Sequence, residues 1–296
     1  MEYGIIFAIL SPLFSSIATI YQSAAVKIMN PIFVVSISGI LGALILLFLI
    51  IISKEKINYR LIKANSKDII TTALLRNLAV AAIFAYGLSL TQGVKAIFFT
   101  KAEPYFVLFW HWIIRKEKIK SQHLLLLGVH AIGAILLSTG GLLQFGKAQT
   151  GDLLIIMAMF ISGFSYIYAS KIPKVLDPKI SNAITMGLGG IILLPLALVL
   201  SQPSQFTEFT GWYYLLAYVI LFSVISMTLW FASLKTVKSW IVSALRSLGP
   251  LAGLPFAWIV FGETLNTVQL VGGAIVVITS ALIAREHFSR ENSKQN

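Results

Sequence analysis

The chain has 296 residues, of which 57% are hydrophobic and only 11% are charged, and its mean hydropathy is +0.87. Soluble domains carry about 25% charged residues, so this composition excludes an ordinary water-soluble protein, and the absence of cysteine excludes disulfides and thiolate chemistry. The formal net charge of +12 comes largely from Lys and Arg in short loops between apolar runs, a pattern typical of membrane topology signals, so we expect no nucleic-acid partner.

Ten apolar runs follow one another along the chain, and each approaches the length of about 20 residues that crosses a bilayer. They cover residues 4–25, 31–53, 68–90, 96–114, 122–143, 151–170, 181–201, 212–234, 240–261 and 267–284. The first run follows Met1-Glu2-Tyr3 without a basic segment or a cleavage site, which predicts a retained helix and not a signal peptide. The sequence thus predicts an all-α integral membrane protein with ten transmembrane helices.

The loops between these runs differ in their content of basic residues. With both termini placed in the cytoplasm, the inner loops hold 17 Lys and Arg residues, whereas the outer loops hold three, namely Lys27, Lys95 and Lys147. Cytoplasmic loops of membrane proteins are enriched in Lys and Arg. We therefore expect a multi-pass protein of the cell (plasma or inner) membrane, surrounded by the lipid bilayer, with both termini cytoplasmic.

The two halves of the chain repeat each other. At an offset of 147 residues the matches include Gly4 with Gly151, Ser15 with Ser162 and Tyr21 with Tyr168; at an offset of 146 they include Pro104 with Pro250, Trp112 with Trp258 and Glu117 with Glu263. Each half holds five spans, an odd number, so the second half should enter the membrane in the opposite orientation. We expect two inverted five-helix repeats, over residues 1–146 and 147–285, and a cytoplasmic polar tail over residues 286–296. Inverted repeats are a recurring plan of secondary transporters.

The fourth and ninth spans are closed by related motifs, Lys101-Ala-Glu-Pro-Tyr105 through Glu117-Lys118 and Leu248-Gly-Pro-Leu251 through Gly262-Glu-Thr-Leu265. Together with the repeat and the chain length, these motifs resemble the ten-helix drug/metabolite transporter superfamily, EamA type. The resemblance covers nearly the whole chain and implies a central cavity lined by the third, fourth, eighth and ninth spans together with the first and sixth. The family usually has small or apolar residues just before the first proline, so the resemblance implies no particular substrate.

Four ionisable residues lie well inside the expected spans: Arg76, Lys101, Glu103 and Arg246. Each costs about 2.5–3.5 kcal/mol near the bilayer centre, so each should face the interior of the bundle and find a partner. One acid cannot neutralise three bases, and the surplus is a formal charge of +2. We expect this surplus to attract an anionic or zwitterionic substrate, because guanidinium groups suit carboxylates and phosphates. Internal ion pairing alone is the alternative.

Two of these residues carry further alternatives. Lys101 could contact the substrate on its route, or its side chain could snorkel to the membrane interface. Glu103 could couple proton flow to transport by changing its protonation state. It could instead form a fixed salt bridge with Arg76 or Lys101.

Aromatic residues are candidates for the cavity wall, although most membrane aromatics face lipid or the interface. From a set that also contains Tyr21 and Tyr166, we assign four to the predicted substrate site: Tyr86, Tyr105, Tyr168 and Trp230.

Prolines occupy equivalent positions within the fourth and ninth spans. Pro104 and Pro250 should bend these helices, either as hinges or as static kinks. His123 and His130 lie seven residues apart without a third ligand nearby, so we predict no metal site. Glu117 and Glu263 should tie loop backbone or neighbouring helix ends together.

The sequence as a whole predicts a secondary transporter that moves a small polar metabolite, an amino acid or another anionic or zwitterionic compound, by alternating access and without a cofactor. One alternative is a transporter of phosphorylated or nucleotide-type anions. A different class, an integral membrane enzyme acting on lipid-linked substrates, is disfavoured because the motifs of zinc proteases, serine hydrolases and nucleotide-binding loops are missing from the sequence. We therefore predict no catalytic residue. The sequence leaves open whether the protein forms a homodimer.

Overall fold

The computed structural model describes residues 2–116, 121–139 and 147–295, and these ranges are helical and contain no strand. The first half comprises α1 (Glu2–Ile28), α2 (Pro31–Ile52), α3 (Tyr59–Ala64), α4 (Ser66–Thr72), the π-helical η1 (Ala73–Val80), α5 (Ala81–Leu90), α6 (Gly93–Phe99), the 3-10 turn η2 (Thr100–Ala102), α7 (Glu103–Arg115) and α8 (Ser121–Thr139). The second half comprises α9 (Lys147–Ala169), η3 (Ile172–Lys174), α10 (Pro178–Leu200), η4 (Pro203–Thr207), α11 (Phe209–Tyr218), the π-helical η5 (Val219–Ser226), α12 (Met227–Thr236), α13 (Ser239–Leu245), the 3-10 turn η6 (Arg246–Leu248), α14 (Pro250–Phe261) and α15 (Thr267–Gln295).

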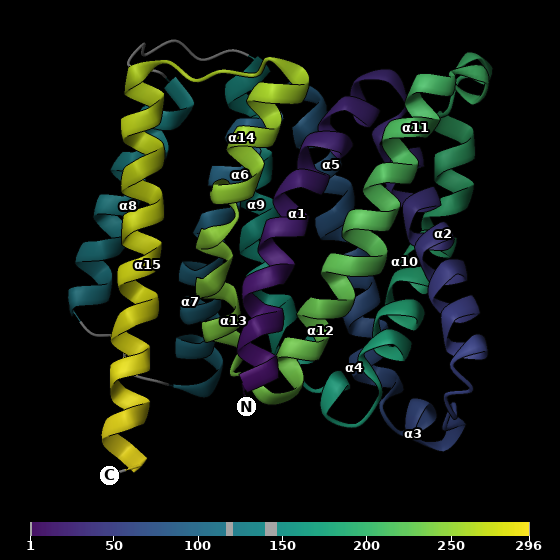
Figure 1. Cartoon of the computed structure of the whole chain (residues 1–296), viewed down its shortest axis with the longest axis horizontal. Helices are drawn as coiled ribbons and strands as arrows, with labels where there is room; N and C mark the ends of the chain where they lie inside the picture. The colour runs from purple at the N-terminus through teal and green to yellow at the C-terminus, as the bar shows by residue number, and fades with distance from the viewer. Residues whose placement is uncertain (1, 117–120, 140–146, 296) are drawn as a thin grey trace.

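The helices stand side by side as a bundle (Figure 1). The start of α1 and the end of α15 lie at the same end of this bundle, which we call the terminal face; the other end is the opposite face. The pair α8 and α15 forms one edge, α2 and α10 lie toward the other, and α1 passes through the middle. Both chain ends thus lie on one side, as an even number of crossings requires.

The internal repeat of the sequence is also a repeat of helical irregularities. The π-helical segments η1 and η5 begin at Ala73 and Val219, 146 residues apart. The 3-10 turns η2 and η6 begin at Thr100 and Arg246, again 146 residues apart. Because these interruptions recur at one fixed offset, the third and fourth spans of the first half have the same construction as the third and fourth spans of the second half.

The equivalent helices α2 and α10 of the two halves run antiparallel. Along the pair α2 and α10, the Asn30 side chain donates to the Leu200 carbonyl at 3.2 Å, the Ser36 hydroxyl donates to the Gly190 carbonyl at 2.8 Å, and Lys179 pairs with Glu55 at the other end. Residue numbers therefore rise along one helix as they fall along its partner. Each helix begins in the same way, with a capping side chain followed by proline, Asn30 with Pro31 and Asp177 with Pro178. This arrangement is the inversion expected from two five-span halves.

The α2–α10 contact depends on glycine. A Cβ atom on Gly190 would lie 2.7 Å from the Ser36 carbonyl oxygen and 2.9 Å from the Ile40 backbone nitrogen. These distances are too short for a side chain, so Gly190 allows the two backbones to approach closely, as small residues do between membrane helices.

Within the described residues, six helical segments are long and apolar enough to cross a membrane: Tyr3–Ile28, Pro31–Ile52, Ser66–Leu90, Gln149–Lys174, Pro178–Leu200 and Phe209–Thr236. The other four expected crossings fall on the interrupted segments around η2 and η6 and on α8 and α15. The expected end of the fifth span at residue 143 lies outside the described residues. The protein is a multi-pass helical membrane protein, and the count of ten crossings stays a prediction, as does the repeat boundary at residue 146.

Two expectations about helix ends can be compared with the structure. Glu263 follows α14. Its carboxylate accepts a hydrogen bond of 2.9 Å from the backbone nitrogen of Val94, near the start of α6. This contact ties two helix ends together, as expected; Glu117 lies outside the described residues. The segment expected as a polar tail continues the helix α15 as far as Gln295.

Candidate functional site

The four intramembrane ionisable residues all lie where helices are interrupted. Arg76 lies in the π-helical segment η1, Lys101 lies in the 3-10 turn η2, Glu103 begins α7 and Arg246 begins the 3-10 turn η6. Irregular backbone at membrane depth is tolerated only inside protein or beside a water-filled cavity. In transporters, interrupted helices often form the substrate site.

Glu103 is the centre of this cluster. Its side chain is 1% exposed, and its two carboxylate oxygens lie 3.7 Å from Arg76 Nη1 and 3.1 Å from Arg246 Nε. The Ser162 hydroxyl donates to Oε1, and the Tyr166 hydroxyl donates to Oε2 at 2.9 Å. Each carboxylate oxygen thus takes part in one ion pair and accepts one hydrogen bond. The expected pairing with Arg76 is present, and the pairing with Arg246 was not predicted.

Arg76 contacts Ser162 and Trp230 in addition to Glu103. Its Nη1 atom donates to the Ser162 hydroxyl at 2.8 Å, and its Cζ atom lies 3.9 Å from the centre of the Trp230 ring. The Trp230 indole in turn donates to the Tyr166 hydroxyl at 3.0 Å. A guanidinium over an aromatic face is attracted by the ring quadrupole. Trp230 therefore belongs to the cluster, and its predicted role toward a substrate stays a prediction.

Lys101 is 2% exposed and does not snorkel to the interface. Its ammonium donates to the backbone carbonyl of Arg246, in the equivalent 3-10 turn of the second half. Gly249 leaves the space for this contact, because a Cβ atom there would lie 2.8 Å from Lys101 Nζ and 2.2 Å from the Ser16 hydroxyl. Lys101 thus joins the two interrupted helices to each other.

The cluster carries a formal excess of positive charge. Arg76 and Arg246 against Glu103 leave +1, and Lys101 raises this to +2. Both arginines and Glu103 also line a cavity of about 80 Å³, measured as the space open to the centres of water-sized molecules. This space is several times the roughly 10–15 Å³ that one water needs by the same kind of measure. The excess charge therefore faces a space that can hold water or a small ligand.

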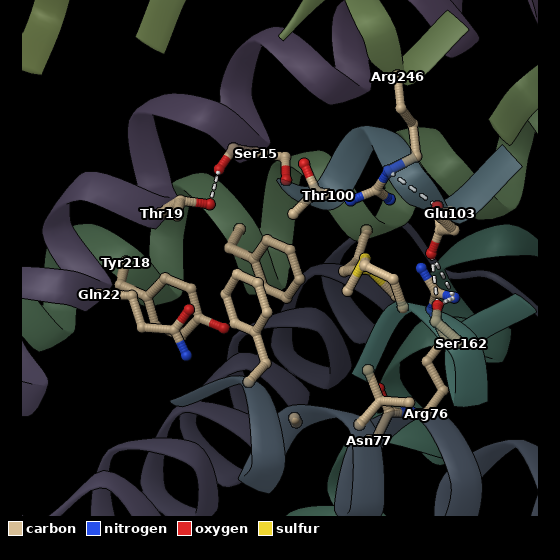
Figure 2. Close-up of a pocket in the computed structure, with 16 residues that line it drawn as sticks. Ser15, Thr19, Gln22, Arg76, Asn77, Thr100, Glu103, Ser162, Tyr218 and Arg246 are labelled. Atoms are coloured by element: carbon tan, nitrogen blue, oxygen red, sulfur yellow. Dashed lines mark hydrogen bonds and ion pairs between the residues drawn. The ribbon is translucent and has the colours of Figure 1, made fainter. Parts of the chain in front are cut away.

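The cavity extends from the cluster toward the opposite face of the bundle. It is lined by residues from the first, third, fourth, sixth, eighth and ninth expected spans: Ser15, Thr19, Gln22, Arg76, Asn77, Val80, Ala81, Phe84, Thr100, Glu103, Met159, Ser162, Tyr218, Phe222, Met227 and Arg246. Figure 2 shows Arg246, Glu103 and Arg76 on one side of this space and Gln22 and Tyr218 on the far side. The six spans are those implied by the family resemblance.

On the terminal side of the cluster, the corresponding space is filled with side chains. Tyr166 and Trp230 are 0% and 1% exposed, and their rings meet edge to face at 5.2 Å. Through the repeat, Tyr166 is the counterpart of Thr19 at an offset of 147, and Trp230 is the counterpart of Phe84 at an offset of 146. Thr19 and Phe84 line the cavity. The two halves therefore surround a cavity on one side of the cluster and packed side chains on the other.

Three predicted aromatic residues lie away from the cluster. Tyr86 is 54% exposed on the surface of α5. Tyr105 is buried against His130, with ring centres 4.3 Å apart, and Tyr168 packs edge to face on Phe164. The structure does not bring these three side chains to the cavity.

Pro104 and Pro250 lie at the first turns of α7 and α14, directly after the 3-10 turns η2 and η6. The expected bends are thus present as interruptions between two helical segments, because a proline without an N–H is tolerated at the first turn of a new helix. A hinge motion at these positions stays a prediction.

Several cavity residues were not singled out from the sequence. Gln22, Asn77 and Tyr218 line the cavity, and Ser162 bonds both Arg76 and Glu103. Uncharged polar residues of these types occur in many membrane helices, so the residue types alone did not indicate a cavity. The match of Ser15 with Ser162 across the repeat was the one available indication, since both line the cavity.

No group of three or more His, Cys, Asp and Glu side chains that could hold a metal ion occurs among the described residues. His130 is buried, and its Nδ1 atom lies 3.1 Å from the Thr279 hydroxyl, where it joins α8 to α15. The ring of His111 contacts the Val107 carbonyl at 2.7 Å in its own helix. These contacts account for the two histidines as packing groups.

Comparison with known proteins finds similar sequences over the whole chain. The model of the EamA-like transporter family matches residues 2–139 and again residues 149–285. A protein named as an uncharacterized transporter from Methanothermobacter thermautotrophicus is 23% identical over 299 residues, covering 95% of this chain and 85% of the relative. A protein of the same name from Clostridium kluyveri is 24% identical over 299 residues, covering 95% and 93%.

One solved crystal structure, whose description names no function, superposes with a TM-score of 0.66 at 13% identity. The similarity covers 94% of this chain and 98% of the other. At this identity the likeness supports the fold alone.

Proposed function

Because this chain belongs to the EamA-like transporter family, we propose that it is a secondary transporter that carries a small anionic or zwitterionic metabolite across the cell membrane by alternating access. The observation that carries this proposal is the buried cluster of Arg76, Arg246, Lys101 and Glu103 beside a cavity between two interrupted helices. The substrate's anionic group, a carboxylate or a phosphate, binds the two guanidinium groups, which together exceed the charge of Glu103.

The two-fold arrangement of the halves supports alternating access. In this state the cavity extends toward the opposite face, and Tyr166 and Trp230 close the terminal side. An exchange of conformations between the two halves would place Thr19 and Phe84 in the closing role and open the terminal side. This exchange is the ordinary consequence of inverted repeats. Both termini lie in the cytoplasm in this proposal, so the present cavity faces outward.

The proposal is tested first by ligand binding. The melting temperature of the purified protein is measured against amino acids, nucleotides and phosphorylated sugars, since a ligand that binds only the folded state raises it. The compound that raises the melting temperature is then loaded into proteoliposomes, and saturable counterflow is measured. Counterflow distinguishes a carrier from an enzyme or a channel, and the identity of the compound decides between carboxylate and phosphate substrates.

We predict that Arg76→Gln and Arg246→Gln each reduce uptake of that compound by about tenfold to a hundredfold. A hydrogen bond to a charged group contributes about 1.5–3 kcal/mol, and about 1.4 kcal/mol corresponds to a factor of ten. The control is Arg60→Gln, because Arg60 is exposed in the short helix α3. Normal uptake by both cluster variants would contradict the assignment of the site.

A further inference from the structure

The cavity has a second polar end, remote from the charged cluster. Gln22 and Tyr218 are 2% and 5% exposed, and both line the cavity. Figure 2 shows them together, on the side away from Arg246 and Glu103. Within the described part of the chain, neither the Gln22 amide nor the Tyr218 hydroxyl has a hydrogen-bond partner. Buried polar groups in proteins nearly always have one, so these two groups are available to something inside the cavity.

This far end is uncharged. Among the described residues that line the cavity, Glu103 is the sole acid and Arg76 and Arg246 are the sole bases, and all three belong to the cluster. Both carboxylate oxygens of Glu103 are already bonded. A ligand ammonium at the far end would therefore meet no carboxylate, and a second ligand carboxylate would meet no cation. Since an unpaired charge is costly to bury, the far end favours a neutral group.

Most of the remaining cavity wall is apolar. Val80, Phe84, Met159, Phe222 and Met227 contribute to it, together with the polar Thr19 and Asn77. Along α1 the cavity reaches from Ser15 to Gln22, seven residues, which corresponds to about 10 Å at about 1.5 Å per residue. This length suits an extended molecule of a few carbon atoms, and the apolar wall suits a methylene chain.

The polar end is not a requirement of the five-helix unit. Through the repeat, Gln22 corresponds to Ala169 at an offset of 147, and Tyr218 corresponds to Thr72 at an offset of 146. Each half therefore forms the same helical unit with a different residue at the equivalent position, alanine in place of Gln22 in the second half and threonine in place of Tyr218 in the first. Gln22 and Tyr218 line the cavity, whereas their counterparts Ala169 and Thr72 are not among its described lining residues, which fits a role toward a ligand.

We propose that Gln22 and Tyr218 are specificity-determining residues that bind an uncharged hydrogen-bonding group of the substrate. The substrate is then a short chain with an anionic group at one end and an amide, carbonyl or hydroxyl group at the other. This inference rests on the proposed function, because it uses the arginine cluster as the anion-binding end.

The test uses four probes that share a carboxylate and a short methylene chain and differ at the far end. Glutaramate ends in an amide, glutarate in a second carboxylate, δ-aminovalerate in an ammonium and hexanoate in a methyl group. Apparent dissociation constants are obtained from the concentration dependence of the melting temperature. We expect the wild-type protein to bind glutaramate about tenfold more tightly than the other three, the factor that one or two added hydrogen bonds supply.

Variants at the far end should change the preference and leave the protein folded. Gln22→Leu and Tyr218→Phe are expected to bring glutaramate to the affinity of hexanoate. Gln22→Glu is expected to shift the preference to δ-aminovalerate, a reversal that a merely structural role would not produce. Tyr213→Phe is the matched control, because Tyr213 lies in the same helix but is 55% exposed.

The outcomes separate this inference from the function on which it rests. Equal binding of all four probes by the wild-type protein, with loss of all four in Arg246→Gln, would overturn the role of Gln22 and Tyr218 and leave the anion site standing. Binding that is unaffected by Arg246→Gln would contradict the proposed site itself. A failure of every probe to raise the melting temperature would contradict both.

Discussion

Glu103 joins three parts of the molecule, because its carboxylate contacts side chains from η1, η6 and α9. Its partners are the two arginines together with the hydroxyls of Ser162 and Tyr166. A buried carboxylate with four such partners is stabilised in its ionised form. The arrangement favours the fixed ion-pair interpretation of Glu103 over the proton-coupling interpretation.

We predict that Glu103→Gln lowers the free energy of unfolding by about 3–5 kcal/mol, because removal of one partner of a buried pair leaves the other charge uncompensated. Denaturation of the purified protein, monitored by tryptophan fluorescence, measures this change. Glu208→Gln is the control, because Glu208 is exposed at the start of α11 and should tolerate the change. Unchanged stability together with a loss of pH-gradient dependence in transport would contradict the ion-pair account and favour proton coupling.

At the scale of residues, intramembrane charge identified side chains that the structure brings together, and aromatic character mostly did not. Arg76, Lys101, Glu103 and Arg246 could be singled out because a charge in hydrocarbon needs a partner. Tyr86 is also apolar enough to face lipid, and nothing in its sequence surroundings distinguishes a lipid-facing position from a cavity position. Gln22 is uncharged, so it was not among the candidates.

At the scale of elements, the interruptions of the fourth and ninth spans bring the charged side chains together. η2 carries Lys101 and η6 carries Arg246, and each is followed by a helix with a proline in its first turn. The two prolines made a bend foreseeable from the sequence. The π-helical segments η1 and η5 carry no such marker, because the extra residue of a π-helical turn depends on packing and not on a particular residue type.

We predict that Pro250→Ala reduces transport several-fold while the melting temperature changes little. Alanine restores a backbone N–H, which lets α13 and α14 approach one continuous helix and draws Arg246 away from Glu103. Uptake into proteoliposomes and thermal denaturation measure the two effects. Pro203→Ala is the control, because Pro203 begins η4, which does not line the cavity. Full transport by Pro250→Ala would contradict a role of the interruption in the site.

The close contact of α2 with α10 gives a second prediction at this scale. Gly190→Ala should destabilise the protein by about 1–3 kcal/mol, as overpacking does, because the new Cβ would meet the backbone of α2. The matched control is Gly128→Ala in α8, where a Cβ would meet nothing within 4 Å. That change should be neutral or slightly stabilising, because alanine favours the helix over glycine. Equal melting temperatures for the two variants would contradict the packing described for α2 and α10.

At the scale of the whole molecule, the inverted plan could be inferred from matched residues at two fixed offsets and an odd number of spans per half. The difference between the halves could not be inferred. Thr19 lines the cavity, whereas its counterpart Tyr166 packs against Trp230 on the filled side. In the proposed mechanism, one sequence must satisfy both the outward-open and the inward-open packing, so the sequence does not indicate which side holds the cavity.

The chain has no cysteine, so single cysteines report the exposure of each side without further changes. The most direct test of the carrier account places one cysteine on each side of the cluster, Thr19→Cys in the cavity wall and Ala169→Cys on the closed terminal side. A membrane-impermeant thiol reagent is then applied from one side of the membrane at a time, at rest and during turnover of the compound found by screening.

The account predicts that, at rest, position 19 reacts from the side of the opposite face and position 169 reacts from neither side. During turnover, position 169 should become reactive from the terminal side while the labelling of position 19 falls. Labelling of both positions from both sides at once, or a position 169 that never reacts during turnover, would contradict alternating access around the arginine cluster.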